Sequence, residues 1–113
     1  MAAPATTARE RVRALNDQLR QHGIGGTTVV TPGVWALGPD AVLAVLAAVA
    51  SFSAFDADND PYGEHDFGSM QVQGRAVFFK IDCYDRSSSG HSPNPADPAV
   101  TTRVLTIMLA QEY

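Results

Sequence analysis

The sequence predicts an α+β fold in which a small, mostly antiparallel sheet of three or four strands packs against three helices. Two observations lead to this prediction: segments with helical spacing of apolar residues alternate with short runs of β-branched and aromatic residues. With 113 residues, 45% of them hydrophobic, the chain suffices for one core and not for two. We expect a single domain over 1–113 with the order α-β-α-β-β-α.

The first expected element is a helix that runs from Thr7 to about Gln21. Glu10 follows Thr7 at the spacing of a capping box, and Gly23 offers a permissive helix end. Residues 1–6 are expected to be frayed. The helix carries arginines that we expect largely in solvent: Arg9, Arg11, Arg13 and Arg20.

The next segments predict two short strands and a second helix. Thr27–Thr31 is rich in β-branched residues, and Val34–Leu37 is expected to pair back after a Pro-Gly turn. Gly38-Pro39-Asp40 then opens a helix whose residues 41–52 are apolar except Ser51. This composition predicts a central helix that is buried on nearly all sides.

A hairpin is the clearest local prediction. Met70–Val72 and Val77–Tyr84 flank Gln73-Gly74, where glycine supplies the positive φ of a tight turn. One face of the second strand is expected to be core and carries Val77, Phe79, Ile81 and Cys83. The other face is available for function and carries Phe78, Lys80, Asp82 and Tyr84.

The C-terminal part predicts a loop followed by a helix. Residues 86–96 are rich in Ser, Pro, Gly and Asn and are expected to form a flexible loop. Asp97 is then expected to cap a last helix that begins at Pro98. Its expected core stripe consists of Val100, Val104, Ile107 and Met108.

Charge and cysteine content limit the function classes. The formal net charge of −4 and the pI near 5.1 argue against direct binding to nucleic acid or to an anionic membrane. Cys83 is the single cysteine, and the N-terminus lacks the pattern of a secretory signal, so we expect a cytoplasmic protein. Neither a phosphate-binding loop nor a zinc cysteine pair is present, and no cofactor is predicted.

An acidic segment follows the second predicted helix. Five of the twelve acidic residues lie within eleven positions, and they are Asp56, Asp58, Asp60, Glu64 and Asp66. Carboxylates so close raise one another's pKa unless they are solvated, paired with a cationic side chain or bound to a metal ion. The function of the chain therefore depends on which of these conditions holds.

The leading hypothesis is a non-enzymatic binding module. An acidic loop that also carries an aromatic residue offers charge complementarity and an anchor to a basic surface of a protein partner. The candidate binding residues are Asp56, Asp58, Asp60, Tyr62, Glu64, His65 and Asp66.

Two alternatives and the oligomeric state stay open at this point. A divalent-metal-binding protein or metal-dependent hydrolase would use Asp56, Asp58, Asp60, Glu64, His65 and Asp82. An EF-hand is excluded, because neither register of the segment has both the glycine and the closing glutamate of that loop. In the second alternative the acids are a structural staple, paired internally with the arginines of the first helix or with Lys80. A homodimer also remains open.

Three segments of the chain resemble a bacterial family that is catalogued only as a domain of unknown function. They are Asp58–Gly68, with its run Asp-Asn-Asp-Pro-Tyr-Gly-Glu-His-Asp-Phe-Gly, then Lys80–Asp85, and 94–110. Where the family often has two tyrosines after Ile-Asp, this chain has Cys83 and Tyr84. The resemblance implies a bacterial accessory gene of a chromosome, plasmid or phage. It thereby suggests an inhibitor or modulator of another protein, with an anti-CRISPR protein as one example.

Overall fold

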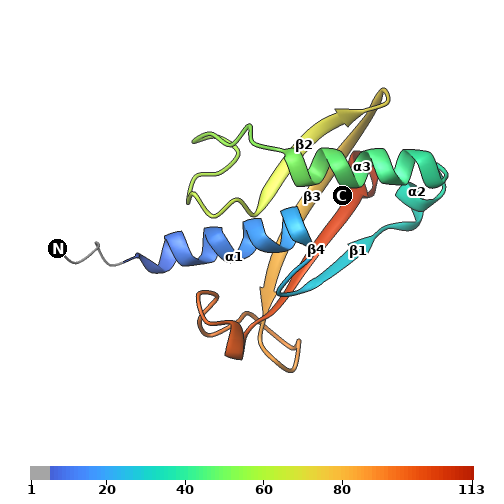
Figure 1. Cartoon of the computed structure of the whole chain (residues 1–113). Helices are drawn as coiled ribbons and strands as arrows, with labels where there is room; N and C mark the ends of the chain where they lie inside the picture. The colour runs from blue at the N-terminus through green and yellow to red at the C-terminus, as the bar shows by residue number, and fades with distance from the viewer. Residues whose placement is uncertain (1–5) are drawn as a thin grey trace.

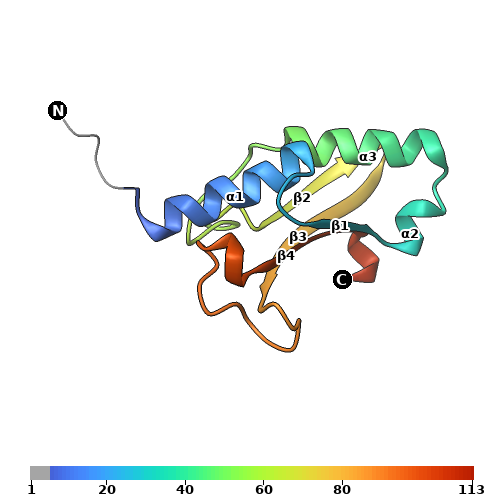
Figure 2. The same cartoon turned by 60° about the horizontal axis from the view of Figure 1, so that its bottom comes forward.

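The computed structural model describes residues 6–113, in which helices cover one face of a four-stranded sheet (Figures 1 and 2). The elements are α1 (Ala8–His22), β1 (Thr27–Val30), α2 (Pro32–Trp35), α3 (Pro39–Ser51), β2 (Phe67–Val72), β3 (Arg75–Tyr84), the 3₁₀ turn η1 (Pro98–Val100), β4 (Thr102–Leu109) and the 3₁₀ turn η2 (Ala110–Glu112). The α+β class is confirmed. The expected fraying of residues 1–6 concerns residues that the structure does not describe, except Thr6. Within 6–113, no helix has the length and apolar character needed to cross a bilayer.

The sheet has the strand order β1-β4-β3-β2 and is mixed. β2 and β3 form the predicted hairpin and β3 pairs antiparallel with β4, whereas the short edge strand β1 runs parallel to β4. Gln73 and Gly74 adopt φ angles of 52° and 79°, both positive as in the favoured two-residue hairpin turn. The register places Gly68, Phe79 and Ile107 side by side across β2, β3 and β4.

The core lies between the sheet and the two longer helices, α1 and α3, which share one face of the sheet (Figure 2). Leu19 of α1 and Val45 of α3 pack there against Phe79 and Ile107, and all four are buried. On the opposite face the ring of Tyr113 packs edge-on against Phe78 of β3, with centroids 5.7 Å apart. The C-terminus therefore contributes to the face that the helices leave open.

The start and end of α1 follow the predicted signals. The Thr7 side chain accepts a hydrogen bond from the backbone N–H of Glu10 at 3.1 Å. Gly23 takes the left-handed conformation with φ of 70°, and its N–H donates to the carbonyl of Leu19 at 2.9 Å. Both caps satisfy backbone groups that the helix itself leaves without partners.

The strand predicted over Val34–Leu37 is wrong, because this region contains the short helix α2. Pro32 occupies its first turn, where a missing N–H costs nothing. The side chain of Glu112 stabilises the turn by accepting hydrogen bonds from the Thr31 hydroxyl at 2.7 Å and from Gly33 N–H at 3.1 Å. A contact with the distant C-terminus thus decides a conformation that the local sequence leaves ambiguous.

The helix predicted after Pro98 is also wrong. Asp97 does cap a turn, by accepting from Ala99 N–H at 2.9 Å, but this 3₁₀ turn ends at Val100 and strand β4 follows. Alternate residues Arg103, Leu105, Ile107 and Leu109 of β4 are buried. The β-branched content of 101–107 and the long antiparallel pairing with β3 favour a strand over the helical spacing of the same apolar residues.

Helix α3 is less buried than its composition predicts. Its inner face carries Val42, Val45 and Val49, which are at most 4% exposed. On the outer side, however, Leu43 is 65% exposed and Leu46 is 36% exposed. A sheet that has helices on one face only can bury one stripe of α3, so the expectation of burial on nearly all sides is wrong.

Candidate functional site

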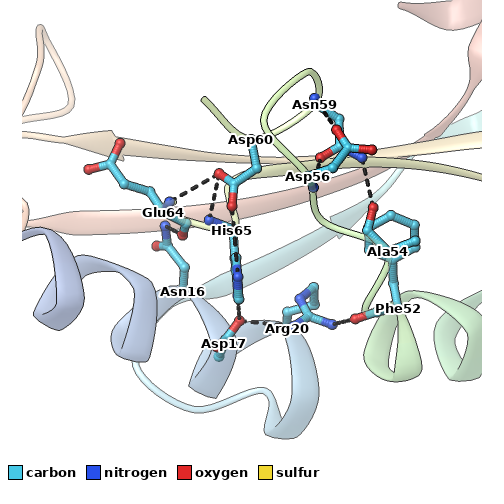
Figure 3. A network of polar contacts seen from close by, with 10 residues as sticks. All are labelled: Asn16, Asp17, Arg20, Phe52, Ala54, Asp56, Asn59, Asp60, Glu64 and His65. Carbon is cyan, nitrogen blue, oxygen red and sulfur yellow. Dashed lines mark hydrogen bonds and ion pairs between the residues drawn. The ribbon is translucent and has the colours of Figure 1, made fainter. Parts of the chain in front are cut away.

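Part of the acidic segment closes the loop between α3 and β2 on itself. One carboxylate oxygen of Asp56 accepts hydrogen bonds from the backbone N–H groups of Asp58 and Asn59, at 2.8 and 2.9 Å. The Asn59 side chain in return accepts from Asp56 N–H at 2.9 Å and donates to the carbonyl of Ala54 at 2.8 Å (Figure 3). Such local bonds are the typical role of Asp and Asn in turns. Asp56 is therefore a structural residue.

Asp60 holds the second half of the loop. Its side chain is buried, and one oxygen accepts from the backbone N–H groups of Glu64 and His65, at 3.0 and 3.1 Å (Figure 3). These bonds fix a bend in which Gly63 and His65 have φ of 65° and 56°. His65 is not a glycine, so its positive φ requires stabilisation of this kind.

His65 connects the loop to α1 and to the core. Its ring stacks on Phe55 with centroids 3.9 Å apart and an interplanar angle of 6°. Nδ1 lies 2.8 Å from a carboxylate oxygen of Asp17 on α1, and Nε2 lies 3.7 Å from Asp60. This histidine is thus held between two carboxylates of the fold itself, with its side chain only partly exposed.

Arg20 extends the same network, contrary to the expectation that it lies in solvent. It is only 5% exposed, and Nη2 donates to Asp17 at 2.9 Å. Nη1 donates to the carbonyls of Val49, Ala50 and Phe52, at distances from 2.9 to 3.1 Å, and Figure 3 shows the contact with Phe52. The last carbonyls of a helix lack intrahelical donors, so the guanidinium caps the C-terminal end of α3.

The side chains of the other candidate residues do not hold the loop together. Asp58 is exposed, Tyr62 is 64% exposed, and Glu64 and Asp66 are partly buried. Figure 3 shows the Glu64 carboxylate directed away from Asp60 and His65. Over residues 6–113, no Lys, Arg or His nitrogen lies within 4.0 Å of the carboxylates of these three acids. The seven predicted residues therefore separate into a structural group and an outward group.

A cleft opens beside the start of β2, where the antiparallel strand β3 extends past it. Backbone pairing continues as far as Ile81, whose N–H donates to the carbonyl of Asp66 at 2.8 Å. Beyond it, Asp82 and Cys83 of β3 have no β2 residue opposite them. The cleft has a volume of about 210 Å³ and is lined by Val12, Asn16, Glu64, Asp66, Ile81, Asp82, Cys83, His91 and Pro95. We call it the acidic cleft.

The electrostatics of the acidic cleft are unfavourable for its own carboxylates. Burial, together with repulsion from Asp66, raises the pKa of Glu64, and Arg9 offsets this only in part. Burial also raises the pKa of Asp66, with further contributions from Asp60 and Asp82. Asp82 is the one of the three lining acids that has a close cation, since Lys80 Nζ lies 3.0 Å away. The cleft therefore gathers three carboxylates, of which Glu64 and Asp66 have no ion-pair partner within 4.0 Å among residues 6–113.

Two buried residues, Asn16 and Arg103, hold the backbone beside the cleft. The sequence analysis did not single them out. Asn16 donates to the carbonyl of Glu64 at 2.9 Å and accepts from Arg103 Nε at 2.8 Å. Arg103 is 2% exposed and also donates to the carbonyl of Pro95. A signal for Asn16 existed, because it lies four residues after Val12 on the core face of α1. Arg103 had no such signal, because the sequence predicts a helix in this segment.

The cleft lacks the features of a nucleophilic or metal site. Burial raises the pKa of the Cys83 thiol, which disfavours the reactive thiolate. Within 6–113, no group of three or more His, Cys, Asp or Glu side chains is arranged to hold a metal ion. Asp56 and Asp60 are in addition already used by backbone N–H groups. The metal alternative thus has no geometric support among these residues.

Comparison with known proteins identifies a family but no activity. Neither the curated proteins nor the solved structures contain a significant match to this chain. The family described as "Protein of unknown function (DUF3768)" matches residues 30–112, which run from the last residue of β1 through β4 and include the acidic segment and most of the acidic cleft. The chain therefore belongs to this family of proteins of unknown function.

Proposed function

We propose that this protein is a non-enzymatic binding module whose acidic cleft receives a lysine or arginine side chain from a basic surface of a protein partner. The observation that carries the proposal is the raised pKa of Glu64 and Asp66 in a cleft where no described cation lies within 4.0 Å of either carboxylate. An incoming ammonium or guanidinium group would form charge-assisted hydrogen bonds with both acids.

The size of the cleft favours a single side chain over a small-molecule substrate. Small-molecule sites commonly have volumes of about 300–1,000 Å³. The acidic cleft, at about 210 Å³, is smaller than this range. Its lining joins carboxylates with the apolar side chains of Val12 and Ile81, which suits the alkyl stem and charged head of lysine.

The loop that carries Glu64 supplies further exposed groups for a partner. Tyr62 is 64% exposed, and the guanidinium of Arg9 lies 5.9 Å from the centre of its ring. Asp58 adds an exposed negative charge in the same loop. The proposed interface therefore uses Asp58, Tyr62, Glu64 and Asp66, while Asp56, Asp60 and His65 shape the loop that carries them.

A protein that binds nucleic acid is the partner class that fits best, because surfaces built for phosphates carry lysine and arginine. On this proposal the chain acts as an inhibitor or modulator that occupies such a surface, in the manner of an anti-CRISPR protein encoded by a mobile element. The contact would be salt-dependent, because exposed charges are screened beyond about 10 Å at 0.1 M salt.

A fluorescent hexalysine peptide tests the cleft directly by anisotropy at low salt. We expect Asp66→Asn to weaken binding by about tenfold, the effect of losing one buried charge contact of about 1.4 kcal/mol. Asp40→Asn is the matched control, because it makes the same chemical change at the exposed start of α3. Equal loss with both variants would mean that only net charge matters and would refute the cleft as the site.

A pull-down from lysate at low and high salt extends the test to a natural partner. We expect the unmodified chain to retain one or more proteins at low salt, and the double variant Glu64→Gln/Asp66→Asn to lose them. Capture that is unchanged by this double variant would contradict the proposal.

A further inference from the structure

Helix α3 presents an apolar stripe on its outer face. Leu43, Leu46, Ala47 and Ala50 recur at the spacing i, i+3, i+4, i+7 and so lie along one side of the helix. Leu43 is 65% and Leu46 36% exposed, and residues 41–50 contain no charged side chain. We call these four residues the α3 stripe. An exposed apolar stripe of this kind marks an interaction surface more often than a plain solvent face.

A shallow groove continues the stripe toward α1. It has a volume of about 340 Å³ and lies between the C-terminal ends of α1 and α3, which are side by side in Figures 1 and 2. Leu46, Ala47 and Ala50 form one wall, whereas Gln21 and Thr28 provide polar atoms at the opposite side. An apolar floor with a polar rim is the usual composition of a protein–protein interface.

We propose that the α3 stripe and this groove form the two-fold interface of a homodimer in which the α3 helices of two copies pack antiparallel. The large side chains, Leu43 and Leu46, lie in the N-terminal half of the stripe, and the small ones, Ala47 and Ala50, lie in the C-terminal half. A two-fold axis between Leu46 and Ala47 places Leu43 against Ala50 of the second copy and Leu46 against its Ala47. Each large residue thus meets a small one. The surface is therefore complementary to itself, as an isologous interface requires.

A second copy fits this surface better than an unrelated partner does. The stripe is complementary to itself in side-chain size, and it is uncharged, so two copies meet without electrostatic repulsion. Trp35, 60% exposed at the end of α2, is a further exposed apolar residue that precedes α3 in the sequence. A stable dimer buries about 800 Å² per copy, so the proposed interface includes the groove residues Gln21 and Thr28 as well as the stripe.

Sedimentation velocity of the full chain over a range of concentrations tests this interface. We expect a dimer at micromolar concentration and, for Leu43→Glu, a dissociation constant raised about tenfold or more. Val29→Glu is the control, because Val29 is an exposed apolar residue on β1, 43% exposed and outside the stripe. A chain that is monomeric at all concentrations, or a dimer unaffected by Leu43→Glu, overturns the proposal.

A size exchange tests the antiparallel register. Leu43→Ala and Ala50→Leu should each weaken the dimer, the first by removing the contact and the second by filling the space that Leu43 of the second copy occupies. The double variant Leu43→Ala/Ala50→Leu restores a large residue opposite a small one and should recover most of the affinity. A double variant that dimerises no better than the weaker single variant refutes this register, and thermal melting of each protein verifies that it is folded.

Discussion

The Nδ1 atom of His65 lies 2.8 Å from a carboxylate oxygen of Asp17, although the two residues are 48 positions apart in the sequence. The same Asp17 oxygen accepts from Arg20 at 2.9 Å. One carboxylate on α1 therefore joins the acidic segment to the guanidinium that caps α3. Through this contact the loop that shapes the acidic cleft is fixed to the helical layer.

Substitution of either residue of this pair should loosen the loop. We expect Asp17→Ala and His65→Ala each to lower the free energy of unfolding by about 1–2 kcal/mol, the usual effect of losing a partly buried, charge-assisted hydrogen bond. Urea unfolding of both single variants and of the double variant measures the coupling. Because the residues contact each other, the double variant should lose less than the sum. Strictly additive losses would show that the contact contributes nothing.

Arg20 should not tolerate replacement by lysine. Its guanidinium donates to Asp17 and to three carbonyls, and it lies 5.3 Å from the centre of the Phe55 ring. A lysine has one nitrogen and cannot reproduce this planar fork. We expect Arg20→Lys to lower the free energy of unfolding by about 2–4 kcal/mol, in the range for disrupted buried ion pairs.

Arg75→Lys is the matched control for this prediction, because Arg75 is exposed at the start of β3. It should change the free energy of unfolding by less than about 0.5 kcal/mol. Guanidinium chloride unfolding compares the two variants, and similar effects of both substitutions would contradict a capping role for Arg20.

The sequence was sufficient for elements with local signals. The capped helix α1 and the hairpin around Gln73-Gly74 were predicted because their start, stop and turn residues act within a few positions. Strand β4 was missed because its apolar residues fit a helical period as well as an alternating one. Only pairing with β3, which the sequence does not display, distinguishes the two.

The acidic segment stays a predicted binding site, and the sequence does not show which of its residues the fold itself uses. The acidic segment was recognised by its charge density, but charge density does not reveal which carboxylates accept hydrogen bonds from their own backbone. Arg20 shows the same limit: it lies eight residues after Val12 and hence on the buried face of α1, a position that arginine seldom occupies. Its acceptors belong to α3, so only the tertiary structure explains its burial.

Gly68 should be required by packing across the sheet. A Cβ at this position would collide with the ring of Phe79 and lie 2.7 Å from a ring atom of Phe52. Gly68→Ala should therefore lower the free energy of unfolding by about 1–3 kcal/mol through overpacking. Gly90→Ala serves as the control, because its Cβ would meet no atom closer than 3.7 Å. Thermal unfolding compares the two, and an equally stable Gly68→Ala variant would show that the aromatic cluster can move aside.

The acidic cleft should oppose folding at neutral pH. Burial raises the pKa of Glu64 and Asp66 above their ordinary values of 4.5 and 3.8, so the folded chain binds more protons than the unfolded chain as pH falls through this window. Ionisation of these groups therefore lowers the free energy of unfolding as pH rises. We expect Glu64→Gln/Asp66→Asn to be more stable at pH 7, by roughly 0.5 kcal/mol for partly exposed charges.

This gain should shrink as the pH is lowered from 7 and should be lost only below the ordinary pKa values of 4.5 and 3.8, because both carboxyls are then protonated in the folded and in the unfolded chain. Urea unfolding of the double variant and of the unmodified chain across this range measures the difference. Asp40→Asn, at the exposed start of α3, should show no such gain at pH 7. A variant that is both more stable and weaker in hexalysine binding identifies carboxylates held for a partner, whereas one that is less stable at pH 7 would assign them a structural role.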